Sequence, residues 1–324
     1  MLGRRGNRPL LAAALLLCAA LAWLVGGWII PGPLEQDKAF TVPDGASLSG
    51  VASKLEADGA IRSAEAFRIR ARIFGRGAPI KAGEFMLPKG ASPSRILSII
   101  QGDAVLRRFV TIPEGMPSIM VYERLMANSQ LTGSIDVPAE GSVLPDTYEI
   151  DRGESRQAVL RRMQAAMQRT LSELWAKRSP NTVVTTPAAA LALAAIVEKE
   201  TGKSDERRIV AGLYSNRLRQ GIMLQADPTI IYPITKGKPL GRRIRQSEIQ
   251  AVNDYNTYTM IGLPKGPITN PGRASIEAVL NPARTDALYM VADGSGGHLF
   301  AKTLDEHNAN VERWFTIRKA RGDF

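Results

Sequence analysis

The sequence predicts an α+β protein in which one N-terminal membrane helix precedes a small α+β module and a larger mixed α/β domain. Three observations lead to this prediction. An uncharged apolar run lies near the N-terminus, a strand–turn–helix pattern recurs in the first half, and a long apolar helix ending in glutamates opens the second half. The chain of 324 residues leaves room for two domains of ordinary size after the membrane helix.

The apolar run is predicted to be a membrane anchor. Residues 10–30 contain no charged side chain and match the roughly 20 residues that a helix needs to cross a bilayer. Arginines and no acid precede the run, so residues 1–9 are predicted to form a basic cytoplasmic tail, with the chain after Pro31 on the periplasmic side. Trp23 and Trp28 lie toward the far end, where interfacial aromatic residues occur. The expected location is the cytoplasmic (inner) membrane, crossed once.

Two other interpretations of the run fit less well. A cleaved signal peptide would have a shorter apolar region and a small-x-small cleavage site, whereas residues 26–31 read Gly-Gly-Trp-Ile-Ile-Pro. A lipoprotein would need a small residue before its cysteine, whereas Leu17 precedes Cys18. Because Cys18 is the only cysteine, the sequence also excludes an intramolecular disulfide and a cysteine metal cage.

The first half repeats a short strand, a Pro-x-Gly turn and a helix. Proline ends each strand, glycine takes the turn, and Ser47 or Ser94 can cap a following helix. The irregular spacing excludes a solenoid and predicts a small module over residues 38–130. The arrangement resembles LysM-type glycan-binding modules, which implies a LysM-like membrane-proximal module. The alternative is a spacer that sets the height of the second half above the membrane. The copies begin at residues 40–47, 85–92 and 110–117.

Residues 140–324 are predicted to form the larger mixed α/β domain. Residues 131–150, around the start of this domain, are rich in turn-forming Gly and Pro. From residue 155 onward, apolar residues recur with the spacing of a helix. The segment 187–200 has apolar residues on all sides, which predicts a buried helix. Helices are expected at residues 155–177, 187–200, 204–220 and 304–319, and strands at 229–232, 288–292 and 299–301.

Composition narrows the possible chemistry. His298 and His307 are the only histidines, and with one cysteine they cannot form an ordinary zinc site, so no metal is expected. The sequence has no Gly-x-Ser-x-Gly elbow, P-loop or dinucleotide fingerprint, so no cofactor is expected. The net charge of +11 favours anionic partners, namely lipid head groups and wall polymers. No nucleic-acid-binding signature is present, so no nucleic acid is expected. The acid–base candidates are therefore carboxylates.

Two glutamates end the predicted buried helix, and they cannot both face one cleft. Glu198 and Glu200 are about 200° apart on a helix of about 3.6 residues per turn. A carboxyl group at the end of an apolar helix can stay protonated near neutral pH. Either glutamate can instead pair with a neighbouring Lys or Arg, and periodicity alone does not choose between them. Asp227 is the next candidate for an acid–base residue. Alternatively, Asp227 has a structural role, because its Asp-Pro-Thr segment is typical of a turn or a helix cap.

Amides and phenols gather downstream of this helix. Gln225, Asn256 and Asn270 can hydrogen-bond N-acetyl or hydroxyl groups. Tyr255 and Tyr258 can stack on sugar faces, although a core position suits either one equally. Together with a protonated carboxyl group, such a set suits a polar, neutral, ring-rich substrate. The pattern therefore indicates sugar chemistry.

Several ordered motifs resemble the MltG (YceG-like) endolytic murein transglycosylases over nearly the whole chain. Lytic transglycosylases in general place the catalytic glutamate before a serine at the end of an apolar helix, and Glu200-Thr201 is the similar pair here. The resemblance therefore implies that Glu200 is catalytic. This chain departs from the common family pattern at Gly202, where alanine is usual, and at Lys265, where a second proline is common. The motifs are residues 197–201, 215–218, 224–229, 255–258, 262–264 and 270–272.

The resemblance also implies the reaction and the partners. A lyase of this family would cut the β-1,4 bond between MurNAc and GlcNAc inside nascent peptidoglycan strands, leave 1,6-anhydroMurNAc ends and terminate strand elongation. Its partners would be glycan strands, the cytoplasmic membrane and peptidoglycan synthases. Two alternatives stay open, namely a non-catalytic glycan-binding scaffold of the wall-synthesis machinery and a hydrolytic muramidase, which needs a second carboxylate.

Overall fold

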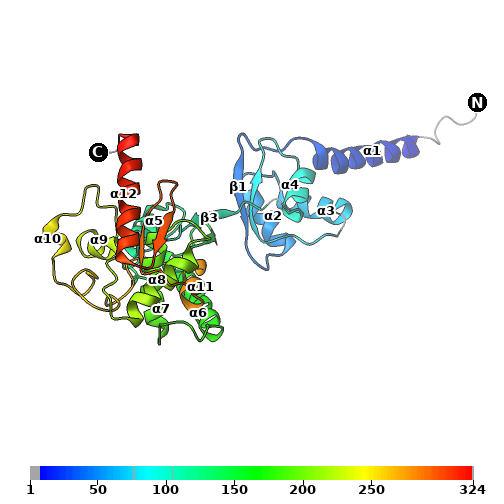
Figure 1. Ribbon diagram of the computed structural model, residues 1–324. Helices are drawn as coiled ribbons and strands as arrows, with labels where there is room; N and C mark the ends of the chain where they lie inside the picture. The colour runs from blue at the N-terminus through cyan, green and yellow to red at the C-terminus, as the bar shows by residue number, and fades with distance from the viewer. Residues whose placement is uncertain (1–7, 76, 104, 323–324) are drawn as a thin grey trace, which may run out of the picture. The chain divides into compact units, whose positions relative to one another are not determined.

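The chain divides into two compact units, which are described separately. The computed structural model describes residues 8–75, 77–103 and 105–322. One unit ends at Arg107 and the other begins at Arg108. Figure 1 shows the first unit in blue to cyan and the second in the remaining colours. Most of the predicted basic tail, residues 1–7, lies outside the described residues.

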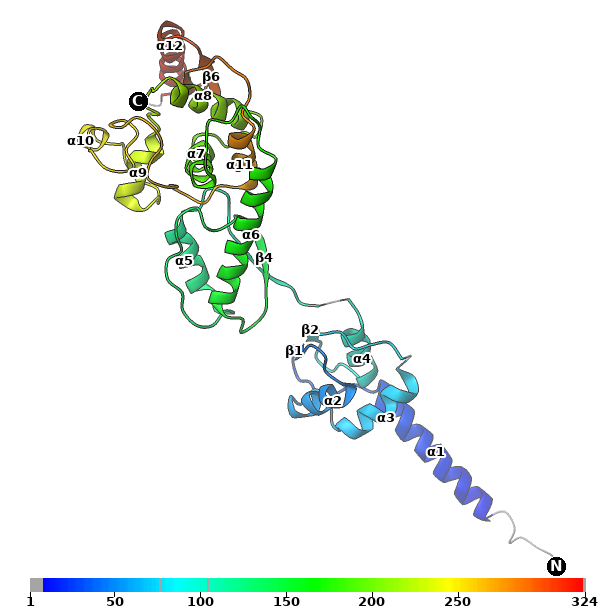
Figure 2. The ribbon, with the colours of Figure 1, turned by 90° about the horizontal axis from the view of Figure 1, so that it is seen from below.

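The first unit combines a long apolar helix with a small α+β fold (Figures 1 and 2). Strands β1 and β2 pair antiparallel, with Phe40 opposite Phe85. Both phenylalanines are buried in one hydrophobic core with Leu55, Phe67 and Ile96. The sequence analysis did not predict α3. The elements of this unit are α1 (Arg8–Ile29), β1 (Lys38–Val42), α2 (Leu48–Ala57), α3 (Ala64–Phe74), β2 (Gly83–Leu87) and α4 (Pro93–Gln101).

Helix α1 covers the predicted anchor, but its last turns belong to the core of the first unit. Over Leu10–Ile29 it is long and apolar enough to cross a membrane. Trp28, however, is buried, and its ring centroid lies 6.0 Å from that of Phe67 and 5.9 Å from that of Phe74. The indole of Trp28 is therefore covered by protein and not by lipid, so it is not an exposed interfacial aromatic residue of the kind that the sequence predicted.

The recurring strand–turn–helix pattern is confirmed in all three copies. Ser47 caps α2 by accepting a hydrogen bond of 3.2 Å from the amide of Gly50. The cap of α4 is Ser92 rather than the predicted Ser94, because Pro93 begins the helix and leaves Ser94 inside its first turn. The turn glycines adopt the left-handed conformation that glycine tolerates best. These are Gly45, Gly90 and Gly115, with φ of 69°, 65° and 72°.

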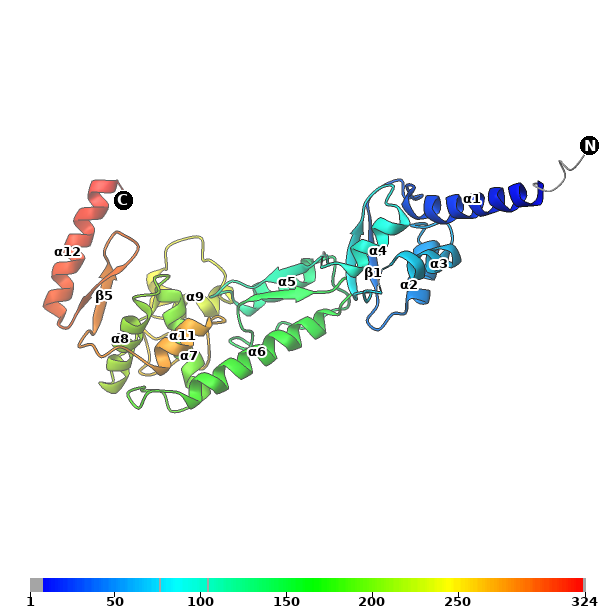
Figure 3. The same ribbon diagram turned by 90° about the vertical axis from the view of Figure 1, so that its right-hand side faces the viewer.

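The second unit contains two hydrophobic cores and small two-stranded sheets. Figure 3 shows the helices of this unit, including α6, α7 and α12. Strand β3 pairs antiparallel with β4, and β5 with β6. Helix α7 lies against α8 and α11 in the larger core, as expected for a helix that is apolar on all sides. The elements are β3 (Arg108–Thr111), α5 (Ser118–Ala127), β4 (Thr147–Ile150), α6 (Arg156–Ala176), α7 (Pro187–Glu200), α8 (Arg207–Arg219), α9 (Asp227–Thr235), α10 (Gln246–Ile249), α11 (Arg273–Leu280), β5 (Tyr289–Ala292), β6 (His298–Ala301) and α12 (Leu304–Arg321).

The boundary between the units differs from the predicted one. Residues 38–130 were predicted to form the first module, and the second was predicted to begin at residue 140. In the structure, β3 and α5 belong with the second unit. Val121 and Leu125 of α5 share a hydrophobic core with Ile150 and Leu160. The third copy of the repeated pattern therefore opens the second unit instead of closing the first.

One predicted strand is a helix. Residues 229–232 lie within α9, which begins at Asp227 with Pro228 in its first turn. Proline at this position is favourable because its fixed φ suits a helix and its missing amide hydrogen is not needed there. The predicted helices at 155–177, 187–200, 204–220 and 304–319 and the two later strands are present, with ends shifted by a few residues.

Candidate active site

A cavity of about 320 Å³ in the second unit contains Glu200. It lies between the end of α7, the inner face of α8 and the start of α9, and residues from β5 and α12 close it. Three of the predicted site residues line it together with Glu200, namely Gln225, Asp227 and Tyr258. The others are Leu213, Tyr214, Arg217, Leu224, Met290 and His307.

Helix α7 positions Glu200 at its last residue. Thr186 caps the start of the helix by accepting a hydrogen bond of 3.1 Å from the amide of Ala189, and Pro187 begins it. At the other end Thr201 is extended and buried. Its hydroxyl donates to Glu206 at 3.1 Å, which fixes the point where the chain leaves the helix. The carboxyl group of Glu200 is therefore held by a rigid element rather than by a loop.

The carboxyl group of Glu200 is desolvated and lies close to a second acid. The pKa of Glu200 is raised to about 7, mainly by burial and secondly by the negative charge of Asp227. A hydrogen bond from Tyr214 and the positive charge of Arg217 act in the opposite direction. Oε1 of Glu200 is buried and has no hydrogen-bond partner among the described residues. This group is thus protonated in a large fraction of molecules near neutral pH.

Glu198 has a different environment on the same helix. Its Oε2 accepts a hydrogen bond of 2.9 Å from the amide of Gly272, which begins the turn into α11. Its other oxygen lies 3.8 Å from Nη2 of Arg207, and only 5% of its side chain is exposed. Glu198 therefore joins α7 to the start of α11, whereas Glu200 faces the cavity. These contacts show which of the two side chains lines the cavity, which periodicity alone did not predict.

Asp227 and Tyr258 form a hydrogen-bonded pair in the cavity. The Tyr258 hydroxyl donates to Oδ1 of Asp227 at 2.6 Å. Burial, followed by this hydrogen bond, raises the pKa of Tyr258 well above its usual value, so the phenol keeps its proton. Asp227 is the first residue of α9, but its side chain does not cap the helix. The capping alternative for Asp227 is therefore wrong.

Gln225 and Arg217 form the adjoining wall. Gln225 has a φ of 53°, a left-handed conformation that is uncommon for a residue with a side chain and that often marks a functional site. Its side-chain oxygen accepts a hydrogen bond of 3.2 Å from Arg217. Arg217 also donates to the carbonyl of Leu288 at 2.6 Å, and its guanidinium lies 5.3 Å from the centre of the Tyr289 ring.

Sequence reasoning did not include Tyr214, Arg217, Met290 or His307 among the site residues. Arg217 belongs to the motif at residues 215–218, which was a usable signal. Tyr214 is three residues before Arg217 and thus shares its helix face. His307 and Met290 come from α12 and β5, and no local pattern connects them with α7.

The structure places Asn256 and Asn270 away from the cavity, where backbone groups and, for Asn270, also the Ser118 hydroxyl and the Glu140 carboxyl group take their hydrogen bonds. The Asn256 side-chain amide donates to the carbonyls of Ile249 and Ala251 at 2.9 and 2.7 Å. The Asn270 side-chain oxygen accepts from the amide of Val143 at 3.0 Å. Both residues are fully buried. Their amides hold loops in place and do not line the Glu200 cavity.

Tyr255 also lies outside the Glu200 cavity, in a second polar cluster. Its ring centroid lies 4.8 Å from that of Tyr232. Tyr232 hydrogen-bonds Glu140, which also accepts from the amide of Ser118 at 2.8 Å. Burial raises the pKa of Glu140 to about 6, while these hydrogen bonds lower it. Tyr255 therefore contributes to packing beside a different carboxyl group.

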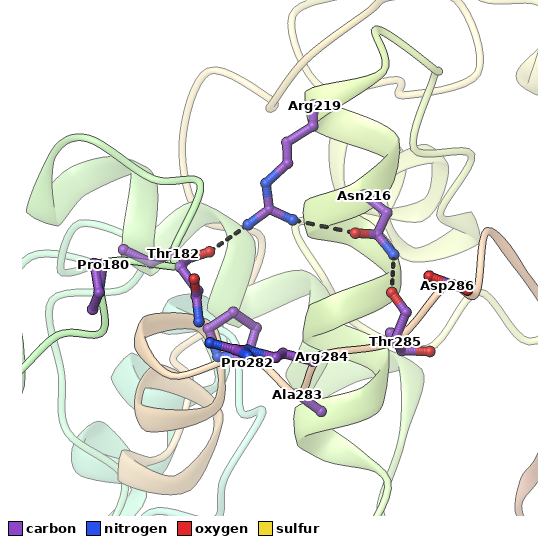
Figure 4. A pocket seen from close by; sticks show the side chains of 10 residues that line it. Pro180, Thr182, Asn216, Arg219, Pro282, Ala283, Arg284, Thr285 and Asp286 are labelled. Atoms are coloured by element: carbon purple, nitrogen blue, oxygen red, sulfur yellow. Dashed lines mark hydrogen bonds between the residues drawn. The ribbon is translucent and has the colours of Figure 1, made fainter.

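A larger hollow of about 650 Å³ lies beside α8, and its polar groups mainly hold the backbone (Figure 4). The side-chain amide of Asn216 donates to the carbonyl of Thr285 at 2.8 Å. Arg219 donates to the side-chain oxygen of Asn216 at 3.2 Å and to the carbonyl of Asn181. The Asp286 carboxyl at its edge is exposed to solvent. The environment that raises the pKa of Glu200 is thus not reproduced at this hollow.

The fold and the cavity together have the features expected of an enzyme that uses acid–base chemistry. A buried carboxyl group with a pKa near neutrality, in a cavity lined by hydrogen-bonding groups, is the arrangement that such enzymes use. Among the described residues, no group of three or more His, Cys, Asp or Glu side chains is placed to hold a metal ion.

Comparison with known proteins agrees with this class. The model of the YceG-like family matches residues 40–313. The chain is 27% identical to an endolytic murein transglycosylase of Bacillus subtilis, over 92% of this chain and 93% of that protein. It is also 27% identical to an endolytic murein transglycosylase of Streptococcus pneumoniae, over 87% of this chain but only 60% of that longer protein. A crystal structure titled as a yceG-like protein from Listeria monocytogenes matches with a TM-score of 0.51 and 25% identity, over 85% of this chain and 99% of that one. The chain belongs to the YceG-like family.

Proposed function

We propose that this protein is an endolytic lytic transglycosylase of peptidoglycan and that Glu200 is its single acid–base residue. The observation that supports this most strongly is the carboxyl group with a pKa of about 7 in a cavity that also holds Tyr214, Asp227 and Tyr258. The relatives named as endolytic murein transglycosylases support the same substrate class.

In the proposed first step, Glu200 acts as the acid. It donates its proton to the oxygen of the β-1,4 bond between MurNAc and GlcNAc, and the bond from that oxygen to C1 of MurNAc breaks. Positive charge develops on C1 and on the ring oxygen. The carboxylate of Asp227 raises the pKa of Glu200, which keeps the proton available. The same negative charge would stabilise the developing cation in the cavity.

In the proposed second step, Glu200 acts as the base. Its carboxylate takes the proton of the C6 hydroxyl of the same MurNAc, and O6 bonds to C1. The product is a 1,6-anhydroMurNAc end, no water is consumed, and Glu200 is protonated again. The hydrogen bond from Tyr214 favours the carboxylate form and so opposes desolvation. A pKa near 7 suits a group that must both give and accept a proton.

Analysis of the products tests this proposal. Glycan strands without peptide cross-links are incubated with the full-length protein, and the new ends are identified by mass spectrometry. Internal cuts with ends that lack one water relative to reducing ends are expected. Reducing ends would instead indicate a hydrolytic muramidase in which Asp227 is the second carboxylate. Uncut strands in the presence of folded protein would leave the glycan-binding scaffold as the remaining alternative.

The proposal also includes a location. Helix α1 would cross the cytoplasmic membrane once, with the N-terminus in the cytoplasm and the rest of the chain on the periplasmic side. There it would meet nascent strands, end their elongation and work beside peptidoglycan synthases, while the LysM-like first unit binds the same strands. A reporter that is active only in the cytoplasm is expected to be silent when fused after Phe324. Activity of that reporter would reverse the topology.

A further inference from the structure

Helix α3 is fixed directly to the end of the membrane helix. Nε of Arg70 donates to the carbonyl of Leu24 at 3.2 Å, and Nη2 donates to the carbonyl of Trp23 at 2.9 Å. The guanidinium also lies 4.4 Å from the centre of the Trp23 ring. Gly27 makes room for this contact, because a Cβ atom there would lie 2.1 Å from Nη2 of Arg70. With Trp28 packed on α3, the last two turns of α1 and helix α3 are one body.

This attachment sets the depth of α3 in a membrane. The span Leu10–Ile29 has 20 residues, which corresponds to about 30 Å at a helical rise of about 1.5 Å per residue and equals a typical hydrocarbon core. Trp23 lies before the end of this span, roughly 9 Å from Ile29 along the helix axis. The carbonyls that Arg70 holds therefore lie inside this span rather than beyond its end. Because Arg70 reaches them with a long side chain, helix α3 itself is held at the boundary between the hydrocarbon core and the head groups.

The exposed face of α3 carries two isoleucines beside arginines, with the acidic Glu65 one turn before Ile69 at the start of the helix. Ile69 and Ile73 are 41% and 56% exposed, and they share one face because they are four residues apart. Ile73 also follows Arg70 by three residues, so this face adjoins the side that contacts α1. Exposed Arg72 lies beside it, and exposed Arg62 precedes the helix. Apolar residues flanked by cations are typical of interfacial helices.

The surroundings of α3 continue this surface. An apolar groove of about 470 Å³ runs between the end of α1 and the start of α3, with Ala22 and Gly26 on one side and Ala66 on the other. Arg62 lies at this groove. Neither Arg62 nor Arg72 has an acidic partner in the part of the chain that the structure describes. Figures 1, 2 and 3 all show α3 beside the end of α1.

We infer that α3 is a membrane-surface helix that binds anionic phospholipids of the outer leaflet of the cytoplasmic membrane. Ile69 and Ile73 enter the boundary between head groups and acyl chains, and Arg62 and Arg72 bind lipid phosphates. The occupant of this face is thus the bilayer itself. The inference rests on the proposed anchoring by α1.

The full-length protein, reconstituted in vesicles that contain phosphatidylglycerol, allows both ideas to be tested separately. The native Cys18 carries a spin label in the middle of α1, and it is exposed in the structure. A second protein, Cys18→Ala with Ile73→Cys, carries the label on α3, and Cys18→Ala with Ser53→Cys is the control on exposed α2. Accessibility of each label to oxygen and to a water-soluble nickel chelate then reports its depth.

We expect the label at position 18 to be accessible to oxygen only, and the label at 53 to the nickel chelate. The label at 73 should be intermediate and protected from nickel several-fold relative to position 53. Adding Arg62→Glu and Arg72→Glu should remove most of that protection.

A water-exposed label at 73 with a buried label at 18 would overturn the inference and leave the anchor intact. A water-exposed label at 18 would overturn the anchor itself. Spin–spin broadening at 73 that persists in detergent would assign the face to a second copy of the chain.

Discussion

Two glutamates that are two residues apart on α7 have separate tasks. Glu198 holds the start of α11 through the amide of Gly272, whereas Glu200 faces the cavity with a buried, unbonded oxygen. The difference follows from helix geometry, because residues two apart lie on opposite faces. The pair therefore supplies a matched control for the proposed chemistry.

Substitution of the two glutamates should separate these roles. Glu200→Gln keeps the shape of the side chain but removes proton transfer, which typically contributes about 10²–10⁴-fold to the rate. Because one residue is proposed to act both as acid and as base, we expect a loss of activity at the upper end of this range. Glu198→Gln still accepts the hydrogen bond of Gly272 and should keep most of the activity. The activity of both variants is measured as the release of anhydromuropeptides from uncrosslinked strands. If Glu198→Gln were inactive and Glu200→Gln active, Glu198 would be the acid–base residue instead of Glu200.

The raised pKa of Glu200 also predicts a dependence of stability on pH. In the unfolded chain this carboxyl group titrates near 4.5, and in the folded protein near 7. The native state therefore holds the proton more tightly, and its stability falls as the pH rises from about 4.5 to about 7. The difference corresponds to roughly 3 kcal/mol. Glu200→Gln removes this cost, so it should melt at a higher temperature than the natural protein at pH 8 and at a similar temperature at pH 4. Equal melting temperatures at both pH values would contradict burial of the carboxyl group.

At the residue scale, sequence reasoning found the carboxyl groups better than the amides. Glu200 and Asp227 could be selected because few other acids end an apolar helix or follow it in a recognisable motif. Asn256 and Asn270 have the same donors and acceptors as a sugar-binding amide, but in the folded chain they bond backbone groups and, for Asn270, neighbouring side chains. A sequence does not show which polar side-chain atoms will form hydrogen bonds with the backbone. The same limit applied to Tyr255.

At the scale of elements, the end of α7 depends on a strand far away in the sequence. Glu206 accepts from the hydroxyl of Thr201 at 3.1 Å, from the amide of His298 at 2.9 Å, and contacts Nδ1 of His298 at 2.8 Å. Burial of Glu206 acts to raise its pKa, but the hydrogen bonds from His298 and Thr201 leave the pKa below its usual value. Glu206 thereby links strand β6 to Thr201, the residue that follows Glu200.

Removal of the Thr201 hydroxyl should loosen this connection. Thr201→Val keeps the shape and leaves one lone pair of the buried Glu206 carboxylate without its donor, which costs about 1–3 kcal/mol. We expect a lower melting temperature and a reduced kcat, because the end of α7 is less well fixed. Thr201→Ser keeps the hydroxyl and should restore most of both. If Thr201→Val matched the natural protein in kcat and melting temperature, the connection would have no influence on the site.

The sequence predicted elements well where local signals agreed and failed where they conflicted. Strand, proline, glycine and helix signals coincide in each copy of the repeated pattern, and all three copies formed. In α9, β-branched residues at 229–231 favour a strand, but Pro228 and the packing of Ile230 in the protein interior favour a helix. Helix α11 was missed because it is short and follows a Pro-Gly turn signal.

At the scale of the whole molecule, the repeated pattern hid the boundary between the units. The third copy resembles the first two in sequence, yet its strand pairs with β4 and its helix packs beside α6. Which partner a strand finds depends on the strands available elsewhere in the chain. That information is not local, so similarity between copies pointed to the wrong unit.

Fragments of the second unit test this boundary. A fragment of residues 140–324 lacks β3 and α5 and exposes the core that Val121 and Leu125 fill. Each fully buried side chain of this size stabilises a fold by about 1.5–3 kcal/mol. We therefore expect residues 108–324 to unfold cooperatively and residues 140–324 to melt at a much lower temperature or to aggregate. Equal thermal stability of the two fragments would place β3 and α5 outside the fold of this unit.

With α1 as the proposed membrane anchor, the joint between α1 and α3 would link the first unit to the thickness of the bilayer. A helix that is longer than the hydrocarbon core tilts, and one that is shorter stays upright or draws the bilayer thinner. Because Trp28 and Arg70 join α1 rigidly to α3, any tilt of α1 turns the first unit by the same angle. In a thinner membrane α1 would lean further and carry α3 with it. The angle at which the first unit meets the lipid surface is then set by the composition of the membrane.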